Sequence, residues 1–180
     1  MAFETDIKST DDWFLGEDKT LRFYTVIGQP IVVAASVEEA DTSITVEPLA
    51  EDVASSVNIR FGLLTVTTSA AADAGDTTLS IAASAGKVPK KRKGYVVQDL
   101  SGWTISWKLY PSPHALNANV LVTVAATLIN ASLGITDIII ADTVLEAITT
   151  VVPGTYFYKL WRTDAGFETV LAYGSVVLRG

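Results

Sequence analysis

The sequence predicts an all-β protein: an immunoglobulin-like β-sandwich into which a small β domain made of two similar units is inserted. Three observations support this prediction. Apolar and polar residues alternate with a period of two in several segments, which is typical of strands with one buried face. Turn residues separate these segments at hairpin spacing. A short motif recurs along the chain, which indicates a duplicated β unit.

The duplication is visible in the motif at residues 41–46, Asp-Thr-Ser-Ile-Thr-Val. It recurs as Asp-Thr-Thr-Leu-Ser-Ile at residues 76–81, a shift of 35 residues, and the same shift places Val53 on Val88. Each copy has the pattern of a turn, an alternating strand and a polar loop. We therefore expect a small domain of two similar β units over residues 36–94.

The segment before the duplicated units is expected to contribute one strand. Residues 12–18 form a loop or edge that carries an aromatic pair, Trp13 and Phe14. Residues 21–27 are rich in apolar, aromatic and β-branched side chains and form the strand. Residues 28–30, Gly-Gln-Pro, then form a turn.

The segment after the duplicated units opens with the most regular strand of the chain, residues 103–109. Its apolar residues share one face and its polar residues share the other. Pro111 and Pro113 end it. Residues 120–128 and 135–140 form two more strands. Polar residues and a glycine between these two strands argue against a membrane span, which needs about 20 mainly apolar residues in a row.

The C-terminal part is expected to fold as a short helix followed by a hairpin. Residues 142–148 form the helix, with Asp142 as its N-cap. Strands at 155–162 and 167–178 are joined by the loop at 163–166.

Tyr156 stands at the start of a late strand, just after a Pro-Gly turn. In immunoglobulin-like sandwiches a tyrosine at this place bonds back to the backbone; aromatic packing alone is the alternative. The strand at 21–27 needs partners for its apolar face, and the strands after residue 95 supply them. We therefore predict a discontinuous sandwich of residues 1–35 and 95–180, with residues 36–94 inserted at a hairpin tip, where insertions cost least.

The composition excludes several kinds of chemistry. The chain has no cysteine, one histidine and one methionine, so it offers no disulfide framework and no thiolate metal site. Hydrophobic residues make up 49% and charged residues 18%, against a usual charged fraction of about 25%. Such a chain has either a large β core or apolar surface that other subunits cover.

Side chains suited to catalysis do not form a recognisable constellation. The acidic pairs at 11–12, 38–39 and 51–52 are adjacent in sequence, so the two carboxylates of a pair in a strand would point to opposite faces. His114 lies alone in a proline-bounded loop. No nucleophile elbow, phosphate-binding loop, dinucleotide fingerprint or EF-hand loop occurs. We predict that the protein is not an enzyme and binds neither cofactor nor metal.

Charge is unevenly distributed along the chain, and one short segment is strongly basic. Residues 1–53 carry net charge −9 and residues 54–180 carry +2. The acidic end disfavours nucleic acid as a partner. The run at 90–93 is open to three interpretations: a solvated loop, a contact with an acidic protein surface such as the N-terminal stretch of a neighbouring copy, or a nucleic-acid patch. The last is disfavoured because no aromatic side chains are interleaved with it.

Aromatic residues offer a second set of contact candidates. Trp103 and Trp107 lie on the apolar face of their strand and are expected in the core, and Phe157 and Trp161 share one face of theirs. Trp13 is the best candidate for an exposed contact. The predicted protein-contact residues are therefore Trp13, Phe14, Lys90, Lys91, Arg92 and Lys93.

Several motifs resemble small β-sandwich modules of tailed-bacteriophage particles, which occur in baseplate, tail-fibre-anchoring and head-associated proteins. They are Leu-Ser-Gly-Trp-Thr-Ile-Ser-Trp at 100–107, Pro-Gly-Thr-Tyr-Phe-Tyr-Lys-Leu-Trp-Arg-Thr-Asp at 153–164 and Gly-Glu-Asp-Lys-Thr-Leu-Arg-Phe at 16–23. The motif repeated in the duplicated units is similar to units found in phage structural proteins. The long insertion departs from the compact form of these modules.

This resemblance implies a non-enzymatic structural protein of the virion, as a capsid decoration or cement protein or as a tail or baseplate component. Its partners would be other virion proteins, in many symmetric copies or as a homo-oligomer, with assembly in the host bacterial cytoplasm and neither nucleic acid nor membrane as a partner. The alternative is a carbohydrate-binding β-sandwich module that presents the Trp13 loop to a glycan. A small hydrolase is a third and weaker hypothesis.

Overall fold

The structure, a computed structural model, describes residues 2–5, 13–14, 18–146 and 151–179. Strands dominate the chain, most of them in antiparallel pairs, and its helices are short. The prediction of an all-β, sandwich-type fold is confirmed. The described part of the chain holds no helix with the length and hydrophobicity needed to cross a membrane.

The chain divides into two compact units. The larger consists of Phe3–Thr25 and Asp99–Gly180, and the smaller consists mainly of Val26–Gln98. The sequence-based boundaries lay at 35/36 and 94/95. Residues 26–35 and 95–98 thus belong with the smaller unit, because apolar side chains in both segments pack into its core, among them Ile31, Val33 and Val96.

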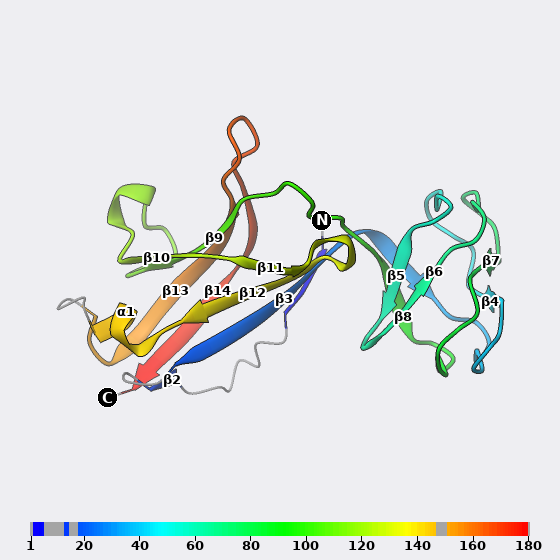
Figure 1. Ribbon diagram of the computed structural model, residues 1–180, viewed down its shortest axis with the longest axis horizontal. Helices are drawn as coiled ribbons and strands as arrows, with labels where there is room; N and C mark the ends of the chain where they lie inside the picture. Colours follow the sequence, from blue (N-terminus) through cyan, green and yellow to red (C-terminus); the bar gives the residue numbers. More distant parts are fainter. Residues whose placement is uncertain (1, 6–12, 15–17, 147–150, 180) are drawn as a thin grey trace. The chain divides into compact units, whose positions relative to one another are not determined.

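The larger unit is built from two sheets, which Figure 1 shows by their labels. The first has the strand order β10-β9-β13-β14-β2, and the second contains β11, β12 and the first part of β3. Only β2 and β14 pair in parallel within the first sheet. The strand bounds are β1 Ala2–Thr5, β2 Trp13–Phe14, β3 Lys19–Val32, β9 Ile105–Tyr110, β10 Val122–Ala125, β11 Thr127–Asn130, β12 Ile135–Ile140, β13 Gly154–Arg162 and β14 Thr169–Arg179.

One predicted strand is split between the two sheets. Residues 120–128 were expected to form a single strand, whereas β10 pairs with β9 and β11 pairs with β12. The chain changes sheets at Ala126, whose N–H donates to the carbonyl of Ile105. Strands that cross between sheets in this way close the corner of a sandwich.

The short helical segments connect strands. Helix α1 is Asp142–Glu146, and the 3₁₀ helices η1 and η2 are Asn117–Asn119 and Ala131–Leu133. The predicted helix began at the same residue, and its last two positions, 147 and 148, lie outside the described residues. The N–H of Asp142 donates to Asp18 Oδ1 at 2.9 Å, which fixes the start of α1 against the residue before β3.

A stack of aromatic rings forms the centre of the larger unit. Trp107 is fully buried and stacks on two rings, Trp13 at 6.1 Å and Tyr158 at 6.2 Å between ring centres. Phe23 meets the edge of Tyr158 at 6.4 Å. Gly174 leaves room for this stack, since a Cβ there would lie 2.7 Å from Tyr158 Oη.

The prediction that Trp13 is an exposed contact residue is wrong. Its side chain is 3% exposed, because β2 pairs in parallel with the end of β14, opposite Leu178, and lays the indole over the core. The side chain of Phe14, the other predicted aromatic contact, lies outside the described part of the structure.

Tyr156 makes the predicted bond back to the backbone. Its hydroxyl donates to the carbonyl of Val152 at 2.9 Å and accepts from the N–H of the same residue at 3.0 Å. The ring itself is buried. This is the tyrosine-corner arrangement of immunoglobulin-like sandwiches, and it fixes the turn that enters β13.

Tyr156→Phe is expected to lower the free energy of unfolding by about 1–3 kcal/mol, because it leaves the Val152 N–H and carbonyl without their partner. Thermal or urea unfolding, compared with Tyr173→Phe at an exposed position on β14, measures the difference. Equal stability of the two variants would contradict a structural role for the Tyr156 hydroxyl.

The smaller unit contains the end of β3 and five further strands. They are β4 Ser43–Thr45, β5 Asn58–Phe61, β6 Leu64–Thr67, β7 Thr78–Ser80 and β8 Lys93–Val97. β8 pairs with both β3 and β5, β5 pairs with β6, and β4 pairs with β7. Buried aliphatic side chains from both copies of the repeat fill the core between them.

The two copies of the repeat are related by a local pseudo-two-fold axis. Ile44 pairs with Leu79, its own equivalent 35 residues on, so the axis passes between β4 and β7. The bridge between Val37 and Val88 becomes the bridge between Val53 and Ala72 when the copies are exchanged. By the same shift residues 31–61 correspond to residues 66–96, which extends the repeat beyond the motif recognised in the sequence.

The predicted turn at residues 28–30 is a bulge within a continuous strand. β3 runs through these residues, and its register against β8 shifts between Ile27 and Ile31. Gly28 has φ +75°, a conformation that favours glycine. The glycine and proline therefore bend the strand instead of reversing it.

Candidate contact surfaces

The outer face of the β9–β13–β14 sheet carries aromatic and cationic side chains. Tyr156, Tyr158 and Leu160 of β13 point into the core, so Phe157 and Lys159, which alternate with them, point away from it. The shared face of Phe157 and Trp161 expected from the sequence is this outer face, where both side chains are partly exposed.

A shallow, mainly apolar groove lies on this face. Its volume is about 240 Å³, and we call it the sheet-face groove. The Tyr173 side chain, 81% exposed, forms one side. The groove is lined by Pro113, Phe157, Tyr158, Lys159, Tyr173, Gly174 and Ser175. It suits an aliphatic or aromatic group with a polar edge.

Ring contacts hold the neighbouring side chains in place. Lys159 Nζ lies 4.7 Å from the centre of the Tyr110 ring, and Lys108 Nζ lies 5.3 Å from that of Trp161. Trp161 Nε1 donates to Tyr110 Oη at 3.1 Å. Burial raises the pKa of the Tyr110 hydroxyl, so it stays protonated in this arrangement. The surface beside the groove is therefore preorganised, which lowers the entropic cost of binding.

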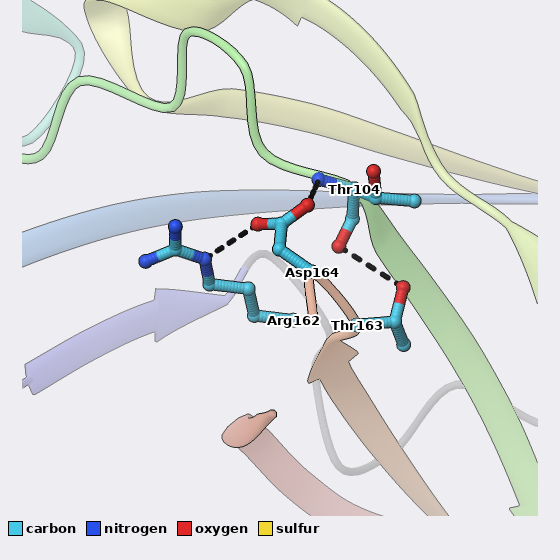
Figure 2. Close-up of polar contacts among 4 residues, drawn as sticks. All are labelled: Thr104, Arg162, Thr163 and Asp164. Atoms are coloured by element: carbon cyan, nitrogen blue, oxygen red, sulfur yellow. Dashed lines mark hydrogen bonds and ion pairs between the residues drawn. The ribbon is translucent and has the colours of Figure 1, made fainter. Parts of the chain in front are cut away.

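A clasp around Arg162 fixes the β13–β14 loop, as Figure 2 shows. Arg162 Nε donates to Asp164 Oδ2 at 2.6 Å, and the other carboxylate oxygen accepts from the Thr104 N–H at 2.7 Å. The guanidinium lies 4.1 Å from the Trp103 ring centre and 4.6 Å from that of Phe167. The hydrogen bond from Arg162 lowers the pKa of Asp164. The Arg162 guanidinium and the Asp164 carboxylate have their partners within the clasp, so its role is structural.

The smaller unit carries opposite charges on its two related halves. Residues 31–61 contain six acidic side chains and one basic side chain, net −5, whereas residues 66–96 contain two acidic and five basic ones, net +3. The backbone repeats, but the charge does not. The charge difference between the two copies is visible in the sequence. It was missed because charge was compared between the two ends of the whole chain and not between the two copies.

The predicted basic contact residues lie together in one exposed turn. Lys90, Lys91, Arg92 and Lys93, which we call the basic turn, follow the Val88 bridge and lead into β8. Lys91 has φ 65° at the turn, as does its equivalent Ser56 with φ 60°. A Cβ at Gly62 would overlap Arg92 Nη2, so the guanidinium lies over that glycine.

A loop in the first half of the unit is acidic. Residues 47–52, which we call the acidic loop, present Glu47, Glu51 and Asp52 beside a cavity of about 90 Å³ whose other wall is the β3 bulge. All three side chains are exposed. Asp52 Oδ1 accepts from the Ala74 N–H at 2.9 Å, which ties the loop to the second copy of the repeat.

The remaining candidates from the sequence do not converge. His114 is exposed, and the acidic pairs at 38–39 and 51–52 lie in exposed loops of the smaller unit; the pair at 11–12 lies outside the described residues. Across residues 2–5, 13–14, 18–146 and 151–179, no three histidine, aspartate or glutamate side chains are arranged to hold a metal ion.

Comparisons with known proteins add no evidence about these surfaces. No protein-family model matches the chain, and neither curated proteins nor solved structures show significant similarity to it.

Proposed function

We propose that the chain is a non-enzymatic structural protein of a bacteriophage particle, acting through repeated protein–protein contacts as a capsid decoration or cement protein or as a tail or baseplate component. The phage assignment rests on the sequence motifs at 16–23, 100–107 and 153–164. The contact role rests on one observation, the sheet-face groove with Tyr173 exposed beside it.

An exposed tyrosine beside a preformed apolar groove is a typical anchor for a protein partner. Tyrosine buries a large ring at low entropic cost and is enriched among the residues that dominate binding energy. Val177, 42% exposed on the same strand, extends the apolar surface. A stable subunit contact buries about 1,600 Å² in total, and symmetric repetition makes individually modest contacts strong.

Tyr173→Ser is expected to reduce the number of copies per purified particle at least tenfold, because it removes the ring from the edge of the groove. Ile139→Ser is the matched control, since Ile139 is an exposed apolar residue on β12 of the other sheet. Quantitative mass spectrometry of particles from phage carrying each allele makes the measurement. Absence of the wild-type chain from particles would refute the virion role, and equal incorporation of both variants would refute the groove as its anchor.

A carbohydrate-binding module is the second candidate. It no longer rests on Trp13, which is buried; the observation that favours it is the exposed Tyr173 ring with Lys159 and Ser175 in the same groove. Sugars stack on such rings while polar neighbours bond to their hydroxyl groups. A glycan array with the wild-type chain tests it, and binding that Tyr173→Ser abolishes is the expected result. Absence of any glycan signal from the wild type removes this candidate.

A further inference from the structure

We propose that copies of this chain associate head to tail through the smaller unit, with the basic turn of one copy seated on the acidic loop of the next. This inference rests on the proposed assembly function and names one of its contacts. The occupant of the acidic loop is a second copy of the chain, and charge complementarity between two surfaces of the same compact unit is the ground for that choice.

The two surfaces lie in the two related halves of the unit, at positions that the pseudo-two-fold axis does not exchange. The acidic loop, residues 47–52, corresponds to residues 82–87, and residues 55–58 correspond to the basic turn. Residues 82–87 carry a single charged side chain, Lys87, and residues 55–58 carry none, so the charges break the pseudo-symmetry that the backbone keeps. A pairing that places like surfaces together is repulsive, whereas one that seats the basic turn on the acidic loop is attractive.

Neither surface is neutralised within the described part of the molecule. Lys87, just before the turn, pairs with Glu38 at 2.7 Å. Among the described residues, by contrast, Lys90, Lys91 and Lys93 form no ion pair, nor do Glu47 and Glu51. These five side chains are exposed. Both halves of a complementary contact are thus available at once on every copy.

The cavity beside the acidic loop departs from the pseudo-symmetry in a way that suits a lysine. In the second half Leu64 packs near Gly86, 3.7 Å from the position of a Cβ on that glycine. The equivalent residues in the first half are Gln29 and Glu51, and both line the open cavity. A neighbour's lysine stem has a partly apolar wall there, from Pro30 and Leu49, and its ammonium meets carboxylates.

In the head-to-tail arrangement that we propose, the contact is heterologous. Each added copy leaves one basic turn and one acidic loop free at the ends, and the association continues as an open row or closes as a ring. A single exposed ion pair contributes little, so several must act together, and added salt must weaken them by screening. Repetition along a particle surface supplies the further strength.

A charge-swap experiment tests the inference with two triple variants. One is K90E/K91E/K93E and the other is E47K/E51K/D52K, so each carries like charges on both surfaces. The expected result is that the wild-type chain associates in sedimentation velocity at about 50 mM salt and disperses near 1 M, where the screening length falls to about 3 Å. Each variant alone should associate at least tenfold more weakly, and an equimolar mixture of the two should associate again.

Restoration in the mixture is the decisive reading, because a variant that merely fails to fold cannot provide it. Far-UV circular dichroism confirms that each variant is folded, and Glu168→Lys, an exposed charge reversal in the larger unit, should leave association unchanged. A wild-type chain that stays monomeric at low salt, variants that associate like the wild type, or a mixture that stays dispersed would each overturn the inference.

This outcome is separable from that of the proposed function. A chain that is incorporated into particles but does not associate in the charge-swap experiment keeps the virion role and loses the head-to-tail contact. A chain that associates by charge in solution but is missing from particles keeps the contact and loses the virion role.

Discussion

Trp107→Ala is expected to lower the free energy of unfolding of the larger unit by about 3–5 kcal/mol, the usual cost of removing a buried tryptophan. Trp107 is fully buried and stacks on both Trp13 and Tyr158. Its removal leaves a cavity and takes a packing partner from both rings. Because domains have about 5–15 kcal/mol of net stability, this one change approaches the limit of folding.

Urea unfolding followed by far-UV circular dichroism measures this effect, with two variants for comparison. Trp161→Ala on the neighbouring strand β13 removes a partly exposed ring from the outer face and is expected to cost less than half as much. Trp107→Phe is expected to cost about 1–2 kcal/mol, because it keeps a ring and removes an indole N–H that is buried without a hydrogen-bond partner among the described residues. Equal costs for Trp107→Ala and Trp161→Ala would show that the stack does not dominate the core.

The strands of the larger unit could be predicted where period-2 alternation is strong. β9 alternates in its residue types and β13 in the burial of its side chains, and the corner at Tyr156 follows from its position after a turn. The local sequence pattern did not predict strand ends that are determined by pairing between distant strands. Nothing in residues 120–128 marks Ala126 as the place where the chain changes sheets.

Trp13 shows the same limit for the candidate site. A two-residue strand has too few residues to display alternation, so an aromatic pair among polar neighbours was interpreted as an exposed anchor. Its burial depends on parallel pairing with Leu178, which is distant in sequence. The groove at Tyr173 was missed for a related reason: its lining comes from β13, β14 and the loop at Pro113, which come together only in the folded protein.

The basic turn was predicted as a contact surface from composition alone, whereas its acidic counterpart was not identified as a contact surface. Both charged segments stand out when each charged residue is compared with the residue 35 positions away in the other copy. Glu51 then corresponds to Gly86, and Asp52 to Lys87. Duplication therefore provides an internal alignment, in which the backbone shared by the copies can be separated from the charges that each has acquired.

Gly94→Ala is expected to destabilise the smaller unit by about 1–3 kcal/mol through overpacking. A Cβ at Gly94 would lie 2.3 Å from Phe61 Cε1, well inside contact distance, and the Phe61 ring is buried, so it has little room to move. Across the pseudo-two-fold axis the equivalent positions hold Ile59 and Val96, which pair between β5 and β8. One site fits a large ring over a glycine, and the other fits two branched side chains.

The equivalent pair supplies the rescue. Phe61→Val alone is expected to leave a cavity, Gly94→Ile alone to overpack, and the double variant F61V/G94I to recover most of the loss, because it recreates the Ile59 and Val96 combination. Hydrogen exchange of the β4–β8 amides, measured by mass spectrometry, follows the smaller unit directly. In the double-mutant cycle, the double variant is expected to lose about 1–3 kcal/mol less stability than the sum of the two single losses. Additive losses in the double variant would mean that the two equivalent sites share a backbone pattern without sharing interchangeable packing.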